Sequence, residues 1–168
     1  LRALDDMLDQ LNLDPALLLR ALQPLLADER TCGLAARILG RAQATDAVEA
    51  LEHSLARTAS LDNRIELLLA LMRLGHRALG MRTLRSILIH GSAEARWRAV
   101  KALSEVATQE DTEALHDMMR LAPRTERLAI AAALYRLGDP RAYAVLARGL
   151  ERLDGESPVD LVQTALDG

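Results

Sequence analysis

An apolar pattern of four residues recurs five times along this chain at a nearly constant interval. Each copy has apolar residues at positions i, i+3, i+4 and i+7, which lie on one face of an α-helix. Successive copies begin 31 or 32 residues apart. The copies are Leu4/Met7/Leu8/Leu11, Ala35/Ile38/Leu39/Ala42, Leu67/Ala70/Leu71/Leu74, Ala99/Ala102/Leu103/Val106 and Ile130/Ala133/Leu134/Leu137. A period of this length is typical of solenoids, in which each repeat buries its apolar face against its neighbours.

Composition favours an all-helical core. Half of the 168 residues are apolar, yet only 2% are aromatic and phenylalanine is absent. A core of Leu, Ala, Val, Ile and Met suits closely packed helices better than β-sheets, which are enriched in aromatic and β-branched residues. We therefore predict an all-α chain whose residues 1–168 form one domain.

Short breaks follow the apolar patterns, and a second amphipathic segment follows each break. Asn12–Pro15 and Gly138–Pro140 are the clearest breaks, because Asp caps the next helix and Pro suits its first position. The predicted repeat unit is therefore a helical hairpin. Pro24 lies inside the segment 15–27, and we expect it to kink or split that helix. His76 stands where the other repeats place Asp.

The predicted hairpins divide the chain into five repeats and a terminal helix. The repeats cover residues 1–27, 28–58, 60–90, 92–122 and 124–153. Ser157–Asp160 has the pattern of a capping box with Pro at the first helical position, which predicts a capping helix over 158–166. Such a helix covers the apolar end of an open stack. The chain opens at Leu1 without a polar cap, so we expect a fragment of a longer protein.

Residues 127–142 resemble the HEAT-like repeat of the short bacterial type that is also found in phycobilin lyases. The resemblance rests on Arg127, Ala133-Leu134, Gly138-Asp139-Pro140 and Ala142. Earlier repeats match in part, through Arg64 with Ala70-Leu71 and Arg96 with Ala102-Leu103. The resemblance implies a right-handed α-solenoid of about five hairpins plus the C-terminal capping helix, with a concave, protein-binding surface made by the second helices. It implies no catalytic residue, because the matching positions are scaffold positions.

Basic residues gather in one part of a chain whose net charge is −3. Residues 73–101 contain seven basic residues and a single acid, Glu94. Arginine suits carboxylate and phosphate, so this segment predicts a site for an acidic protein or a phosphate-bearing ligand unless flanking acids neutralise its charge. Nucleic acid is a less favoured partner, because high overall basicity and aromatic stacking platforms are missing.

Candidate partner-binding residues lie in this segment and on the second helices of the last two repeats. They are Arg73, Arg77, Arg82, Arg85, Trp97, Arg98, His116, Arg120, Tyr143 and Arg148. A partner contact, stacking under a neighbouring Arg and a plug between repeats explain Trp97 equally well. Arg64, Arg96 and Arg127 hold equivalent positions in successive first helices, and we interpret them as structural.

Motifs for chemistry are missing from the sequence. The four histidines are scattered, Cys32 is alone, and no zinc, nucleotide-binding or nucleophile motif is present. The apolar run Leu67–Met72 is too short to span a membrane, and no signal peptide is recognisable. We therefore expect a non-enzymatic, cytoplasmic protein-interaction scaffold, or a cytoplasmic domain of a larger protein, without cofactor, metal or membrane insertion. Alternatives are a nucleic-acid-binding module that uses residues 73–101 and, less favoured, a phycobilin-lyase-like subunit; oligomeric state stays open.

Overall fold

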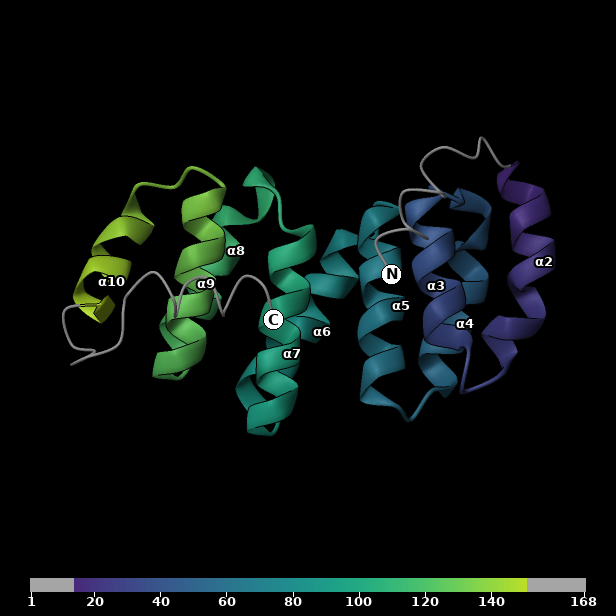
Figure 1. The fold of residues 1–168 in the computed structure, drawn as a ribbon, viewed down its shortest axis with the longest axis horizontal. Coiled ribbons are helices and arrows are strands. Elements are labelled where there is room, and N and C mark those ends of the chain that lie inside the picture. The colour runs from purple at the N-terminus through teal and green to yellow at the C-terminus, as the bar shows by residue number, and fades with distance from the viewer. Residues whose placement is uncertain (1–13, 151–168) are drawn as a thin grey trace. The chain divides into compact units, whose positions relative to one another are not determined.

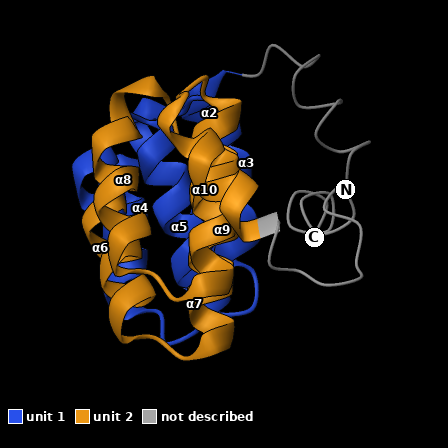
Figure 2. Cartoon of the chain, turned by 90° about the vertical axis from the view of Figure 1, so that its left-hand side faces the viewer, with its two compact units in different colours: residues 1–80 blue, residues 81–168 orange. Residues whose placement is uncertain are grey.

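The computed structural model describes residues 14–150, and this part of the chain is helical without a β-strand (Figure 1). The all-α prediction is confirmed for it. The described residues fall into two compact units, residues 14–80 and residues 81–150, which Figure 2 shows in blue and orange. We call them the N-terminal and C-terminal units and describe each by itself. The first apolar pattern, Leu4 to Leu11, and the predicted capping helix 158–166 lie outside the described residues.

Helical hairpins make up both units. The N-terminal unit contains α2 (Pro15–Ala27), α3 (Cys32–Arg41), the 3₁₀ helix η1 (Thr45–Ala47), α4 (Val48–Arg57), α5 (Leu61–Arg73) and the start of α6 (Arg77–His90). The C-terminal unit contains the rest of α6, α7 (Ala93–Val106), the 3₁₀ helix η2 (Gln109–Asp111), α8 (Thr112–Leu121), α9 (Arg124–Arg136) and α10 (Arg141–Leu150). Each of the ranges 28–58, 60–90, 92–122 and 124–153 thus holds two α-helices.

Helix starts follow local capping chemistry. The Asp14 carboxylate accepts a hydrogen bond from the backbone N–H of Ala16 at 3.0 Å, and Pro15 occupies the first helical position, as predicted. Asp139 accepts the corresponding bond from the N–H of Arg141 at 2.8 Å. Here α10 begins one residue after Pro140, a small difference from the predicted start.

Pro24 does not split α2, so of the two expected effects, a kink or a split, the split does not occur. The α-helix runs without interruption from Pro15 to Ala27 and contains Pro24. Pro24 lies in the last turn, where its missing N–H removes the single bond to the carbonyl of Arg20 and few residues follow. The packing of Leu22 and Leu26, which are both buried, holds the helix on either side of it.

Two glycines end the first helices of their hairpins. Gly75 and Gly138 have φ angles of +96° and +84°, in the left-handed region that glycine adopts without steric cost. The residue after each glycine donates its N–H back to the last turn: His76 to Leu71 at 2.9 Å and Asp139 to Leu134 at 3.1 Å. This is the Schellman arrangement, which satisfies carbonyls at the end of a helix. It turns the chain back after α5 and α9.

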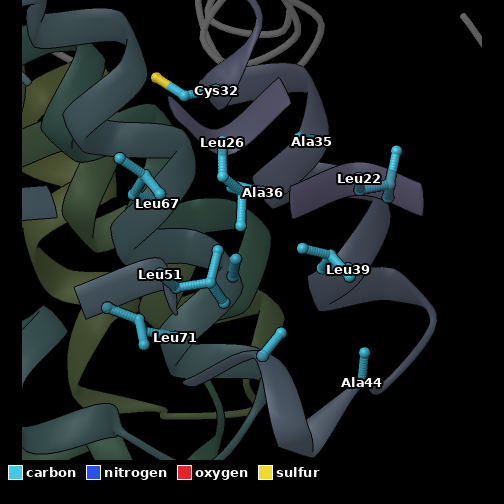
Figure 3. Packing of buried hydrophobic residues seen from close by; sticks show 12 residues of the cluster. Leu22, Leu26, Cys32, Ala35, Ala36, Leu39, Ala44, Leu51, Leu67 and Leu71 are labelled. Atoms are coloured by element: carbon cyan, nitrogen blue, oxygen red, sulfur yellow. The ribbon is translucent and has the colours of Figure 1, made fainter. Parts of the chain in front are cut away.

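The core of the N-terminal unit is built mainly from small and aliphatic residues of α3 and α5, which pack against each other and against α2 and α4. Leu39, Leu67 and Leu71 of the apolar patterns are fully buried. Figure 3 shows Leu67, Leu71 and Leu51 of α4 on one side of this cluster and Leu39 on the other. A Cβ atom at Gly40 would lie 2.7 Å from the Cα of Ala70, so α3 and α5 approach at backbone distance.

In the C-terminal unit α9 packs against α7, α8 and α10. The buried members of the repeated pattern are again central to the core: Ala99, Ala102, Leu103, Val106, Ile130, Ala133 and Leu134. Leu115 and Met118 add the inner face of α8. The apolar pattern therefore marks the buried face in both units.

Candidate docking surfaces

One exposed face of α6 combines unpaired positive charge with an apolar residue. Arg82, Arg85, Ser86 and Ile89 are all exposed, and their i, i+3, i+4, i+7 spacing places them on a single side of the helix. Among the described residues neither Arg82 nor Arg85 has a hydrogen-bond or ion-pair partner. Ile89 is 43% exposed. We call these four residues the α6 face.

Other basic residues of the segment 73–101 are differently placed. Arg73 and Arg77 belong to the N-terminal unit, are half-buried, and neither is free of interactions. Arg98 pairs with Glu94 one helical turn away, with 2.7 Å between Nη2 and Oε1. Lys101 is exposed on α7. The structure therefore brings Arg82 and Arg85 together on one helix face but does not show the whole segment as one surface.

Arg96 is held by hydrogen bonds to other residues of the C-terminal unit. Its Nε donates to Oε1 of Glu126 on α9 at 2.7 Å, and its Nη1 donates to the carbonyl of Gly91 at 3.0 Å. Burial of Glu126 raises the pKa of its carboxyl, but hydrogen bonds from Thr125 and Arg96 outweigh this effect and leave the pKa lowered. Arg127 makes the same bond to the carbonyl five residues before it, Ala122, at 3.0 Å. These contacts fit the structural interpretation of Arg96 and Arg127, whereas Arg64 is exposed on α5.

His116 and Asp139 connect α8 to the turn before α10. Nε2 of His116 lies 2.8 Å from Oδ2 of Asp139, and both side chains are largely buried. Arg141 bonds to both oxygens of Asp139 and, at 2.7 Å, to Glu113 of α8. The predicted partner residue His116 is thus held in an internal network.

Asp139→Asn is expected to lower the stability of the C-terminal unit at neutral pH and to weaken its response to acid. Hydrogen bonds from Arg141 and then His116 hold the pKa of Asp139 well below its ordinary value of 3.8. A lowered carboxyl pKa contributes stability that is present above pH 3.8 and is lost as the pH falls below it. Thermal unfolding from about pH 7 to about pH 3 checks this. The difference in Tm between wild type and variant should narrow in acid; a constant difference would contradict the prediction.

The remaining candidates are exposed and are spread over α7, α8 and α10. Trp97 on α7 is 38% exposed, and Tyr143 on α10 is 64% exposed. Arg148 is exposed on α10 as well, whereas Arg120 pairs with Asp117 on its own helix. Partial exposure of Trp97 leaves a surface available to a partner.

Sequence reasoning missed a groove between α2 and α4. Its volume is about 710 Å³, and α2 contributes Leu19, Gln23, Leu26 and Ala27 to its walls. Asp46, Glu49 and Glu52 give the opposite wall an acidic character. The spacing of Glu49 and His53 places both on one helix face, but the apolar wall comes from residues more than twenty positions earlier. The apolar pattern within one helix does not predict which other helix packs beside it, so the groove between α2 and α4 could not be predicted from that pattern.

Within residues 14–150, no group of three His, Cys, Asp or Glu side chains is arranged to hold a metal ion. Cys32 is buried, and its burial is the main cause of the raised pKa of its thiol. The negative charge of Glu29 is the second cause. None of the helices described has the length and apolar content that crossing a bilayer requires.

No protein-family model, curated protein or solved structure matches this chain.

Proposed function

We propose that this protein is a non-enzymatic protein-interaction module of the HEAT-like, short bacterial type, working in the cytoplasm as a scaffold or adaptor. The repeated hairpins would stack into a right-handed α-solenoid. Packing within each unit supports this: first helices pack on first helices, α3 on α5 and α7 on α9, and the second helices α2 and α4 also touch. Such like-on-like packing is how a solenoid buries its repeats.

The α6 face is the observation that favours an acidic partner. Arg82 and Arg85 hold two guanidinium groups, one turn apart, that have no partner among the described residues, and Ile89 adds an exposed apolar side chain on the same side of the helix. Arg is enriched in binding hot spots, and its planar fork matches carboxylates. In the C-terminal unit Arg96, Arg98, Arg120 and Arg141 pair with acids. An acidic protein surface would complement Arg82 and Arg85, which have no such partner among the described residues.

Reversing both charges with Arg82→Glu/Arg85→Glu is expected to weaken binding of the acidic partner about tenfold, which corresponds to about 1.4 kcal/mol. Both side chains are exposed, so the thermal transition should stay unchanged. Quantitative affinity capture with wild-type and variant baits, followed by titration of the captured protein, measures the loss. Arg20→Glu/Arg124→Glu is the matched control, because both arginines are exposed and unpaired among the described residues.

Two results would overturn the proposal that the α6 face binds an acidic protein. One is equal affinity of the variant and the control for the same partner. The other is a mobility shift of duplex DNA or RNA that fades steeply with salt and is lost in Arg82→Glu/Arg85→Glu, because counterion release is the signature of phosphate binding. The second result would establish the nucleic-acid alternative instead.

A further inference from the structure

The groove between α2 and α4 has the size and form of a binding site. The two helices pack side by side (Figure 1), and the space between them measures about 710 Å³. Binding pockets usually have volumes of about 300–1,000 Å³. Leu19, Leu26 and Ala50 supply an apolar lining, whereas Asp46 and Glu49 stand exposed at the opposite side.

Hydrogen bonds hold the walls of the groove in place. The hydroxyl of Ser54 on α4 shares its single hydrogen between two acceptors, the carbonyl of Leu26 on α2 at 3.1 Å and the carbonyl of Ala50 at 2.9 Å. Ser54 is buried, as is Leu26. The groove is thus formed before any ligand arrives, which lowers the entropic cost of binding.

Charge in the groove is predominantly negative and largely uncompensated. Among the described residues, Asp46 and Glu49 have no hydrogen-bonding or ion-pair partner for their carboxylates. Glu52 lies 3.6 Å from Nδ1 of His76, an attraction that requires a protonated imidazole. Of the described residues that line the groove, Arg57 is the only Arg or Lys. A ligand with positive charge and an apolar side would satisfy both walls.

We propose that this groove binds a basic amphipathic helix of a partner protein. Its apolar residues, three or four positions apart, would contact Leu19 and Leu26, and its Arg or Lys side chains would pair with Asp46 and Glu49. This helix-in-groove arrangement uses a surface separate from the α6 face. It extends the proposed scaffold function, and its failure would leave the Arg82/Arg85 experiment unaffected.

Charge disfavours the chain's own N-terminal residues as the occupant. Residues 1–13 carry Asp5, Asp6 and Asp9 against Arg2. Their net negative charge would be repelled by Asp46 and Glu49. A second copy that inserts its own α6 face is the other basic occupant the chain offers, and the experiment below separates it from a partner helix.

The probe is a fluorescent amphipathic peptide of Leu, Ala and Arg, with Leu at every third or fourth position, measured by anisotropy against the full chain. A peptide with Glu in place of Arg is the control and should not bind. Glu49→Lys should weaken binding of the Arg peptide about tenfold. Glu110→Lys makes the same charge change at another exposed, unpaired first-turn position, and should change affinity less than about twofold.

Steric filling of the groove gives an independent readout. Gln23 lines the groove and is exposed, so Gln23→Trp should abolish peptide binding without lowering the Tm. Leu17→Trp is its control, because Leu17 lies on the same helix, is exposed and does not line the groove. Equal peptide affinity of Glu49→Lys and Glu110→Lys, or full binding by Gln23→Trp, overturns the proposal. So does self-association in sedimentation that both Glu49→Lys and Arg82→Glu/Arg85→Glu abolish, since it would identify a second copy as the occupant.

Discussion

Replacing Leu71 with alanine is expected to lower the free energy of unfolding by about 2–5 kcal/mol. Leu71 is fully buried in the cluster that α3, α4 and α5 form (Figure 3). The substitution removes buried methyl and methylene groups and leaves a cavity that rigid neighbouring helices fill only in part. Urea unfolding followed by the helical circular-dichroism signal measures the loss.

Leu17→Ala is the matched control for Leu71→Ala. Leu17 is 62% exposed on α2, so its truncation should change the free energy of unfolding by less than about 0.5 kcal/mol. If Leu71→Ala cost no more than this control, the repeated apolar pattern would not mark the core, and the packing described for the N-terminal unit would be wrong.

Gly40→Ala is expected to lower the free energy of unfolding by about 1–3 kcal/mol, although alanine favours helices over glycine by up to about 1 kcal/mol. The added Cβ would lie 2.7 Å from the Cα and 2.9 Å from the Cβ of Ala70. A backbone atom cannot move aside by rotating a side chain, so α3 and α5 must separate. That separation loosens the packing of Leu39 and Leu71.

Gly80→Ala makes the same chemical change in a different setting. There the new Cβ would meet Cγ and Sδ of Met72, an unbranched side chain that can adopt other rotamers. Thermal and urea unfolding of the two variants should therefore show a larger loss for Gly40→Ala. A larger loss for Gly80→Ala would show that helix separation at Gly40 is not the limiting contact.

Helix positions and the buried faces of α3, α5, α7 and α9 followed from local sequence features. The i, i+3, i+4, i+7 pattern identified Leu39, Leu71 and Leu134 as buried, and all three are. Capping chemistry at Asp14 and Asp139 located the starts of α2 and α10 to within a residue. Pro24 was the exception, because the cost of proline depends on how much helix follows it and on the packing that holds that helix.

Which charged groups remain available was decided only by the tertiary structure. Arg82 and Arg96 belong to the same basic segment, but the partner of Arg96 is Glu126, 30 residues further along the chain. In the same way, Asp46 and Glu49 become one wall of a groove because Leu19 and Leu26 of α2 form the other.

The physical reason for this division is the range of the interactions. Helix formation and amphipathicity depend on residues within a few positions of each other, so the sequence by itself determined the helices and their apolar faces. Ion pairs and grooves depend on the register between helices of successive repeats, which the differing breaks after α3, α5, α7 and α9 adjust. Tertiary packing therefore decided that Arg96 stabilises the scaffold while Arg82, Arg85 and the α2–α4 groove face solvent.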